Sequence, residues 1–186
     1  MDYDEYLNKC ESIVEMGLFT DADGIPIAFG IAPGNSSEQN TLIPLERKML
    51  QNFDLSSFIV CTDAGLSSAT NRWFNSYDKE DGCRSFITTQ SIKKLKSHLR
   101  QWSLAPQGWK LSGEQSGKTY DIRELDEEND KEKIFFKSRW VKEKAVVRER
   151  GKQKAVVIEQ QLIVFYSIKY RDYLRSIRDG QIERAK

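Results

Sequence analysis

The chain has 186 residues, of which 39% are hydrophobic and 31% are charged, and this length predicts one globular domain with a smaller appendage. No apolar run approaches membrane-spanning length and no signal peptide is evident, so we expect no membrane span. The net charge of +1 conceals three strongly charged blocks: residues 91–110 hold five bases and no acid, residues 121–132 hold seven acids and two bases, and residues 137–154 hold eight bases and two acids.

Cysteine and histidine usage argues against several kinds of site. The three cysteines, Cys10, Cys61 and Cys83, form no C-x-x-C pair, and the only histidine, His98, lies among lysines. Zinc binding and Ser-His or Cys-His catalysis therefore have almost no residues to use. We expect a reduced cytoplasmic protein in which the cysteines are inert core or boundary residues and His98 is a surface residue.

The N-terminal third predicts a hairpin followed by a helix. Residues 13–32 form two β-prone runs around a turn at residues 21–24, and Pro26 suits the start of a strand. Ser37 and Glu38 resemble a helix entry, and an apolar stripe at helical spacing follows, made of Leu42, Leu45, Met49 and Phe53.

The next elements alternate between strand and helix. Residues 57–62 are almost continuously apolar and predict a strand covered on both faces, ending at a single carboxylate, Asp63. The pair Ser67-Ser68 can cap a helix that extends to Phe74, and residues 84–89 predict another strand. A helix over 91–102 would place its lysines opposite an apolar face.

The composition changes near Ala105. Residues 105–160 contain turn signals and short β-prone pieces at 134–141 and 155–158, which predict a β-rich insertion. A final strand at 161–167 and a helix at 170–186 follow. The predicted organisation is therefore a domain over 1–104, an insertion over 105–160, and a return strand and helix over 161–186.

Four segments together resemble the central part of bacterial insertion-sequence transposases: MGLFTDADGIPIAFGIAPGNSSEQNTLIPLERKML, FIVCTDAGLSSATNRWF, FITTQSIKKLK and YSIKYRDYLRSIRDGQIERA. The pieces D-G-I-P and P-G-N-x-x-E-x-x-T-L, ahead of a strand-borne D-x-G-L, are specific as a set. The resemblance covers most of the chain, from Ile13 to Lys186, and is least specific between residues 105 and 160.

This resemblance implies an α/β fold with an RNase H-like mixed sheet, flanked by helices and interrupted by the β-rich insertion. In the family, three carboxylates (Asp, Asp and Glu) hold two divalent metal ions that activate a water or a DNA 3′-hydroxyl for attack on phosphate. Asp63 matches the second carboxylate, so the resemblance implies a catalytic residue and a ligand of Mg²⁺ or Mn²⁺. The implied partner is DNA at transposon ends, and no small-molecule cofactor is implied.

Two of the family's three carboxylates have no counterpart in the sequence. The first would lie on a strand before the hairpin, where only MDYDEYLNKCES stands, and the Glu pattern Y-x2-R-x3-E-x6-K does not occur after Arg175 or Arg178. We therefore expect a central fragment that binds metal weakly and is inactive alone. The strand at 13–20 should lie at a sheet edge, which favours self-association.

Two basic segments are candidate DNA contacts, although a charged run is usually a solvated face. Lys137 and Trp140 lie in the second segment, which mixes basic and aromatic residues as phosphate and base contacts do. The predicted DNA-binding residues are Lys93, Lys94, Lys96, Arg100, Arg139, Lys142, Lys144, Arg148 and Arg150.

Other interpretations remain open at the level of sequence. The chain can be a non-enzymatic DNA-binding or assembly remnant that interferes with a full-length transposase, or a divergent metal-dependent nuclease that uses Asp63 with a local carboxylate such as Asp21. Asp63 can also be a simple turn former before Ala-Gly. Asp21 and Asp23 suit hairpin turn positions, and Asn35 and Glu38 suit a helix entry better than a contact with substrate.

Overall fold

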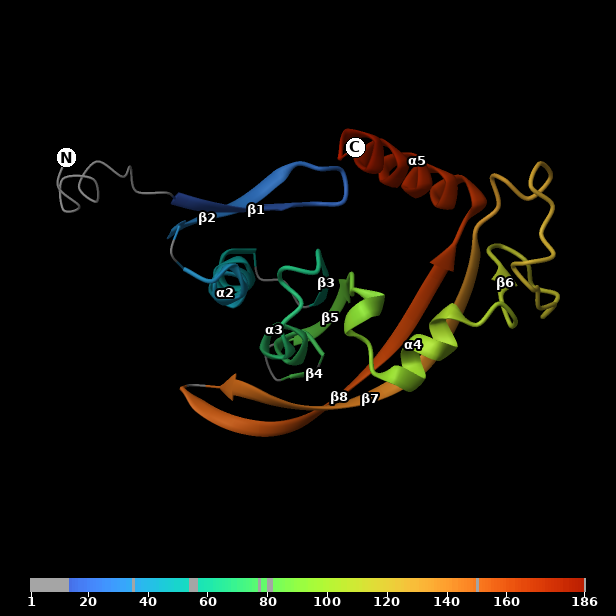
Figure 1. Cartoon of the computed structure of the whole chain (residues 1–186). Coiled ribbons are helices and arrows are strands. Elements are labelled where there is room, and N and C mark those ends of the chain that lie inside the picture. Colours follow the sequence, from blue (N-terminus) through green and yellow to red (C-terminus); the bar gives the residue numbers. More distant parts are fainter. Residues whose placement is uncertain are drawn as a thin grey trace. The chain divides into compact units, whose positions relative to one another are not determined.

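The computed structural model describes residues 14–34, 36–53, 57–76, 78–79, 82–149 and 151–185, and Figure 1 draws the chain. The described chain is a mixed α/β structure, which confirms the predicted α/β class. It divides into two compact units, Met1–Gln90 with Glu143–Ile158 (unit 1) and Ser91–Lys142 with Glu159–Lys186 (unit 2). The predicted domain borders at residues 104 and 160 stay predictions.

Unit 1 contains the predicted hairpin. Strand β1 (Val14–Thr20) pairs antiparallel with β2 (Pro26–Pro33). The Asp21 side chain shapes the turn, because its Oδ1 accepts hydrogen bonds from the backbone N–H groups of Asp23 (3.0 Å) and Ile25 (2.8 Å). Residues 21–24 therefore act as turn residues, as their composition predicted.

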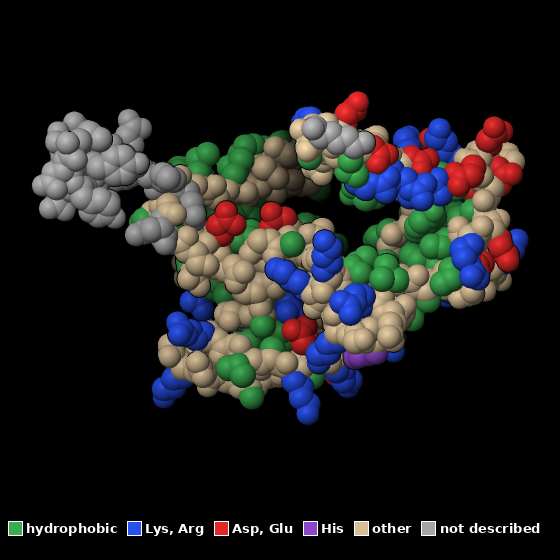
Figure 2. All heavy atoms as spheres, viewed as in Figure 1, with side chains coloured by type: hydrophobic (Ala, Val, Ile, Leu, Met, Phe, Trp, Pro, Cys, Tyr) green, Lys and Arg blue, Asp and Glu red, His purple; other side chains and the backbone are tan. Residues whose placement is uncertain are grey.

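The two faces of the hairpin differ. On one face, Gly17 and Gly30 lie opposite each other, and a Cβ at Gly30 would stand 3.6 Å from the Leu45 side chain of helix α2 (Leu42–Phe53). The other face bears the cross-strand pairs Val14/Pro33, Met16/Ile31 and Leu18/Phe29. Met16 is 71% exposed there, and Figure 2 shows hydrophobic side chains along the hairpin. Among the described residues β1 and β2 pair only with each other. The predicted edge position of β1 depends also on residues 2–8, which lie outside the described residues, and stays a prediction.

A three-stranded sheet follows the hairpin in unit 1. In chain order the elements are the 3-10 turn Glu38–Asn40, α2, β3 (Ser57–Thr62), α3 (Ala69–Phe74), β4 (Asp78–Lys79) and β5 (Gly82–Thr88). Strands β3 and β5 run parallel, and β4 pairs antiparallel with β5. Helix α3 begins where the sequence predicted, because the Ser68 side chain accepts a hydrogen bond from the Asn71 N–H (3.1 Å).

Strand β3 is covered on one face only, as far as the described residues show. Val60 is buried, whereas Ile59 is 63% exposed and Cys61 is exposed and free. The expectations of a strand covered on both faces and of an inert core or boundary cysteine at position 61 are therefore wrong. The described packing partners of this sheet contact Phe86 of β5. Because Phe86 pairs with Val60 and lies on the same face of the sheet, these partners cover the Val60 face and leave the Ile59 face exposed.

Those partners come from a long hairpin. Strand β7 (Phe135–Glu149) and β8 (Lys152–Tyr166) replace the predicted short pieces, and the strand predicted at 161–167 is the end of β8. In unit 1, the hairpin tip forms a cluster with partly buried residues of α3 and β5. Its members are Val147, Val156 and Ile158, packed against Ala69, Trp73, Phe86 and Ala145.

Unit 2 contains the remainder of this hairpin and the later helices. Its other elements are the 3-10 turn Ile92–Lys94, α4 (Ser97–Leu104), β6 (Lys110–Leu111) and α5 (Ile168–Arg184). The single helix predicted over 91–102 is wrong, because Leu95 and Lys96 adopt extended backbone and divide it into two elements. None of the helices in the described ranges is long and apolar enough to cross a membrane.

A buried polar cluster in unit 1 is centred on Glu46 of α2. Glu46 is fully buried, and the Asn75 side-chain amide donates to its two carboxylate oxygens at 2.8 and 3.0 Å. Burial raises the pKa of Glu46 to about 7, although the hydrogen bond from Asn75 and the positive charge of Arg84 oppose this rise. Arg84 is itself buried, and its guanidinium carbon lies 4.2 Å from the centre of the Phe74 ring. The sequence did not predict this cluster.

Candidate functional site

Asp63 directly follows β3, at the carboxyl end of a strand that runs parallel to β5. The hydroxyl of Thr88, at the end of β5, donates to the Asp63 carbonyl (3.0 Å). The Asp63 Oδ1 accepts hydrogen bonds from the backbone N–H groups of Gly65 (2.9 Å) and Leu66 (3.3 Å). The carboxylate is thus a turn former, and because Asp63 is an exposed residue it is also available to a ligand.

A second carboxylate lies close to Asp63. A Cβ built on Gly65 would stand 3.1 Å from Asp63 Oδ1 and 3.2 Å from Glu38 Oε2, so these two oxygens are no more than 6.3 Å apart. Glu38 is exposed in the 3-10 turn before α2, and Ser37, the residue before it, makes no side-chain capping bond. The sequence suggested helix entry for Glu38 and missed its proximity to Asp63. The P-G-N-x-x-E spacing was the one available signal.

Asp21, the other carboxylate considered as a metal ligand, has a structural role in the hairpin. The carboxylate of Asp21 is engaged in its own turn, which supports the turn role for Asp21 and weakens its role as a metal ligand. No group of three or more His, Cys, Asp or Glu side chains that could hold a metal ion occurs among the residues that the structure describes. Asn35 lies outside those residues.

The first predicted basic group is exposed in unit 2. Lys93 and Lys94 belong to the 3-10 turn, Lys96 precedes α4, and Arg100 lies within α4. His98 is also exposed on α4, as expected. These side chains are accessible to a polyanion, but they occupy two short elements instead of one continuous helix face.

The second predicted basic group is spread along β7 and belongs to both units. Lys144 and Arg148 are exposed on the hairpin tip in unit 1, on the strand face opposite the buried Val147. In unit 2, Lys142 pairs with Glu159 (2.6 Å), and the Arg139 guanidinium lies 5.3 Å from the Trp102 ring centre. Arg150 lies outside the described residues.

Lys137 belongs to the same charged block but is not a surface residue. It is only 4% exposed, and its Nζ donates to the carbonyls of Trp102 (3.1 Å) and Ala105 at the end of α4. The ring of Trp109 lies 4.5 Å from this nitrogen, and burial lowers the Lys137 pKa. The interpretation of Lys137 as a DNA contact is therefore wrong, because its charge satisfies the helix carbonyls.

Within unit 1, the hairpin tip is attached to the helix that follows Asp63. Arg72 of α3 makes a two-pronged ion pair with Glu143 of β7, at 2.7 and 3.0 Å. The backbone N–H of Arg148 also donates to the Thr70 hydroxyl (3.3 Å). Because α3 begins just after the Asp63 turn, Lys144 and Arg148 project from a strand that is anchored to the same scaffold as Asp63.

No protein-family model matches the chain, and no curated protein or solved structure is significantly similar to it.

Proposed function

We propose that the chain is part of an RNase H-like DNA transposase in which Asp63 is one of the carboxylates that hold Mg²⁺ or Mn²⁺. The observation that carries this proposal is the placement of Asp63, an exposed carboxylate at the carboxyl end of a parallel strand, followed by the tight turn through Gly65 and Leu66. Ligands of open α/β sheets bind outside the carboxyl ends of parallel strands. The resemblance to insertion-sequence transposases implies that this position holds the second catalytic carboxylate.

The strand arrangement of unit 1 is compatible with such a sheet. The resemblance places the strand that bears the first Asp beside the hairpin. In the described residues, β1 and β2 form one sheet and β3, β5 and β4 form another. The parallel pairing of β3 with β5 and the antiparallel pairing of β4 with β5 are compatible with a mixed sheet of this kind.

The donor set suits a hard divalent ion bound weakly. Mg²⁺ prefers oxygen ligands and retains several waters, and Asp63 with Glu38 can supply two carboxylates. When bound, such an ion would polarise the phosphoryl oxygen of DNA. The chain holds the Asp63 carboxylate in place through hydrogen bonds from the Gly65 and Leu66 N–H groups. The Thr88 hydroxyl, which donates to the Asp63 carbonyl, fixes the backbone at the same position.

DNA would be held by the hairpin tip. Lys144 and Arg148 can neutralise phosphates, and each neutralised phosphate makes the affinity fall more steeply with salt, by about 0.9 in the slope of log K against log salt. The Arg72–Glu143 ion pair fixes this strand to α3 and so orients the basic side chains relative to the sheet that bears Asp63.

The DNA contact is tested by fluorescence anisotropy of labelled duplex DNA over a range of salt concentrations. The double variant Lys144→Gln/Arg148→Gln should reduce the salt slope by about 2. The control Lys118→Gln/Lys131→Gln removes the same charge from exposed positions of unit 2 and should leave the slope unchanged. Equal changes in both double variants would contradict a specific contact at the hairpin tip.

The catalytic role is tested by cleavage of DNA that bears transposon ends. We expect no cleavage by residues 1–186 with Mg²⁺ or Mn²⁺, since two-metal chemistry needs several carboxylates. A longer protein that adds a strand bearing the first Asp and a helix bearing the Glu should cleave, and Asp63→Asn should abolish that activity. End-specific cleavage by the chain alone, or a longer enzyme that is indifferent to Asp63→Asn, would refute the assignment.

A second candidate, a divergent metal-dependent nuclease, is favoured by the proximity of Glu38 to Asp63. It predicts that the chain alone nicks plasmid DNA with Mn²⁺ and that Asp63→Asn and Glu38→Gln each remove the activity. Asp21→Asn serves as the control, because the Asp21 carboxylate is engaged in the hairpin turn. The third interpretation, a non-enzymatic remnant, predicts DNA binding without any nicking.

A further inference from the structure

Helix α5 bears a stripe of basic residues that the proposed function does not use. Arg171, Arg175 and Arg178 are spaced by four and three residues, so they lie on one side of the helix. Lys169 lies two residues before Arg171 and therefore points to another side of the first turn. Figure 2 shows basic and acidic side chains side by side along this helix. These cations can bind phosphates only where carboxylates do not already occupy their N–H donors.

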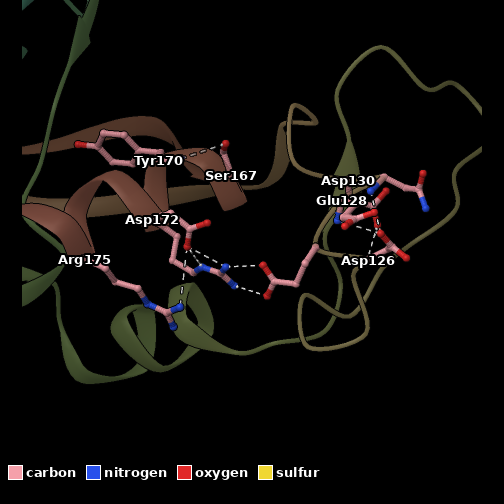
Figure 3. Close-up of polar contacts among 10 residues, drawn as sticks. Asp126, Glu128, Asp130, Ser167, Tyr170, Asp172 and Arg175 are labelled. Atoms are coloured by element: carbon pink, nitrogen blue, oxygen red, sulfur yellow. Dashed lines mark hydrogen bonds and ion pairs between the residues drawn. The ribbon is translucent and has the colours of Figure 1, made fainter.

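The acidic loop, residues 121–132, engages the first two of these cations within unit 2. Glu127 binds Arg171 through both carboxylate oxygens, at 2.6 and 3.0 Å, and Glu132 pairs with Lys169 (2.7 Å). Arg171 is only 23% exposed in its side chain, and its carboxylate partners raise its pKa. In Figure 3 the loop that bears Asp126, Glu128 and Asp130 faces the part of α5 that bears Asp172 and Arg175.

Other hydrogen bonds and an ion pair, which do not involve the side chains of Glu127 and Glu132, hold the acidic loop in its conformation. The Asp126 Oδ1 accepts hydrogen bonds from the N–H groups of Glu128 (2.9 Å) and Asn129 (2.7 Å), and the Asp130 Oδ2 accepts one from the Asp126 N–H (2.9 Å). Asp130 also pairs with Lys133 (2.7 Å). Glu127 and Glu132 are therefore not needed for the shape of the loop, and their exposed carboxylates are presented to α5.

A carboxylate that accepts hydrogen bonds from a guanidinium through both of its oxygens occupies the same N–H donors that a phosphate would use. We propose that the basic residues of α5 bind DNA phosphates, Arg171, Arg175 and Arg178 along one side and Lys169 at its first turn, and that the acidic loop is a built-in competitor for Arg171 and Lys169. DNA must displace Glu127 and Glu132 to bind Arg171 and Lys169. This inference takes its partner class, DNA, from the proposed function but depends on a different set of residues.

The test compares two double variants that change the charge of the same loop equally. Glu127→Gln/Glu132→Gln removes the two competing carboxylates and keeps their size. Glu124→Gln/Glu128→Gln removes two carboxylates of the loop whose side chains make no hydrogen bond or ion pair with α5 in the described part of the chain. We measure duplex-DNA affinity and its salt dependence by anisotropy, with thermal melting to establish that both variants are folded.

We expect the first variant to bind about tenfold more tightly than the second and to have a salt slope steeper by about 2, because two further phosphates are neutralised. Adding Lys169→Gln/Arg171→Gln to the first variant should remove this gain. Equal affinities and slopes in the two loop variants would overturn the inference. The proposed hairpin contact is judged separately, by Lys144→Gln/Arg148→Gln, so either proposal can fail while the other holds.

Discussion

The buried carboxylate of Glu46 should make the stability of the protein depend on pH. In the folded chain its pKa is about 7, against 4.5 for the ordinary side chain, because burial disfavours the charged form. Between these values the folded state binds more protons than the unfolded state, so this contribution to stability is complete below pH 4.5 and is lost as the pH rises to about 7. At about 1.36 kcal/mol for each pH unit, the total is on the order of 3 kcal/mol.

Glu46→Gln removes the titrating group and isolates its effect. Urea unfolding, followed by tryptophan fluorescence, gives the free energy of unfolding of both proteins at several pH values. Because all other groups titrate alike, the wild-type protein should lose on the order of 2 to 3 kcal/mol more than the variant between pH 5 and pH 8.5.

A second variant controls for the hydrogen bonds from Asn75. Glu46→Leu cannot accept these bonds, so it should be less stable than Glu46→Gln at every pH. Both variants should nevertheless show the same pH dependence, since both lack the ionisable group. Parallel curves for the wild-type protein and the two variants would refute the conclusion that burial controls the protonation of Glu46.

Three further perturbations test other parts of the structure. Ser68→Ala removes the cap of α3 and should lower the free energy of unfolding by about 1 kcal/mol in urea titrations, whereas Ser67→Ala, which leaves that cap intact, should change it less. Lys137→Met leaves the carbonyls of Trp102 and Ala105 without their donor and should cost about 2 kcal/mol; an unchanged melting temperature would contradict the helix-end role. Met16→Lys places a charge on the exposed hairpin face and should reduce concentration-dependent association in sedimentation experiments, and a wild-type chain that stays monomeric at high concentration would argue against an adhesive hairpin.

Local features were predictable from the sequence because they depend on neighbouring residues. The turn at 21–24 follows from an Asp side chain that bonds N–H groups two and four residues later. The start of α3 follows from the Ser68 cap, and the strand that ends at Asp63 follows from a short apolar run before Ala-Gly. Each of these features is determined within about five residues of chain.

Features that join distant segments were decided only by the tertiary structure. Charge content placed Lys137 in a basic surface block, but its burial depends on the end of α4, more than thirty residues earlier. The apolar run of β3 could not reveal that its partners cover only the Val60 face. Likewise, Glu38 stands near Asp63, and Glu46 is buried against Asn75, because separate elements pack together. Burial and proximity depend on which segments meet, and the local pattern of a sequence does not contain that information.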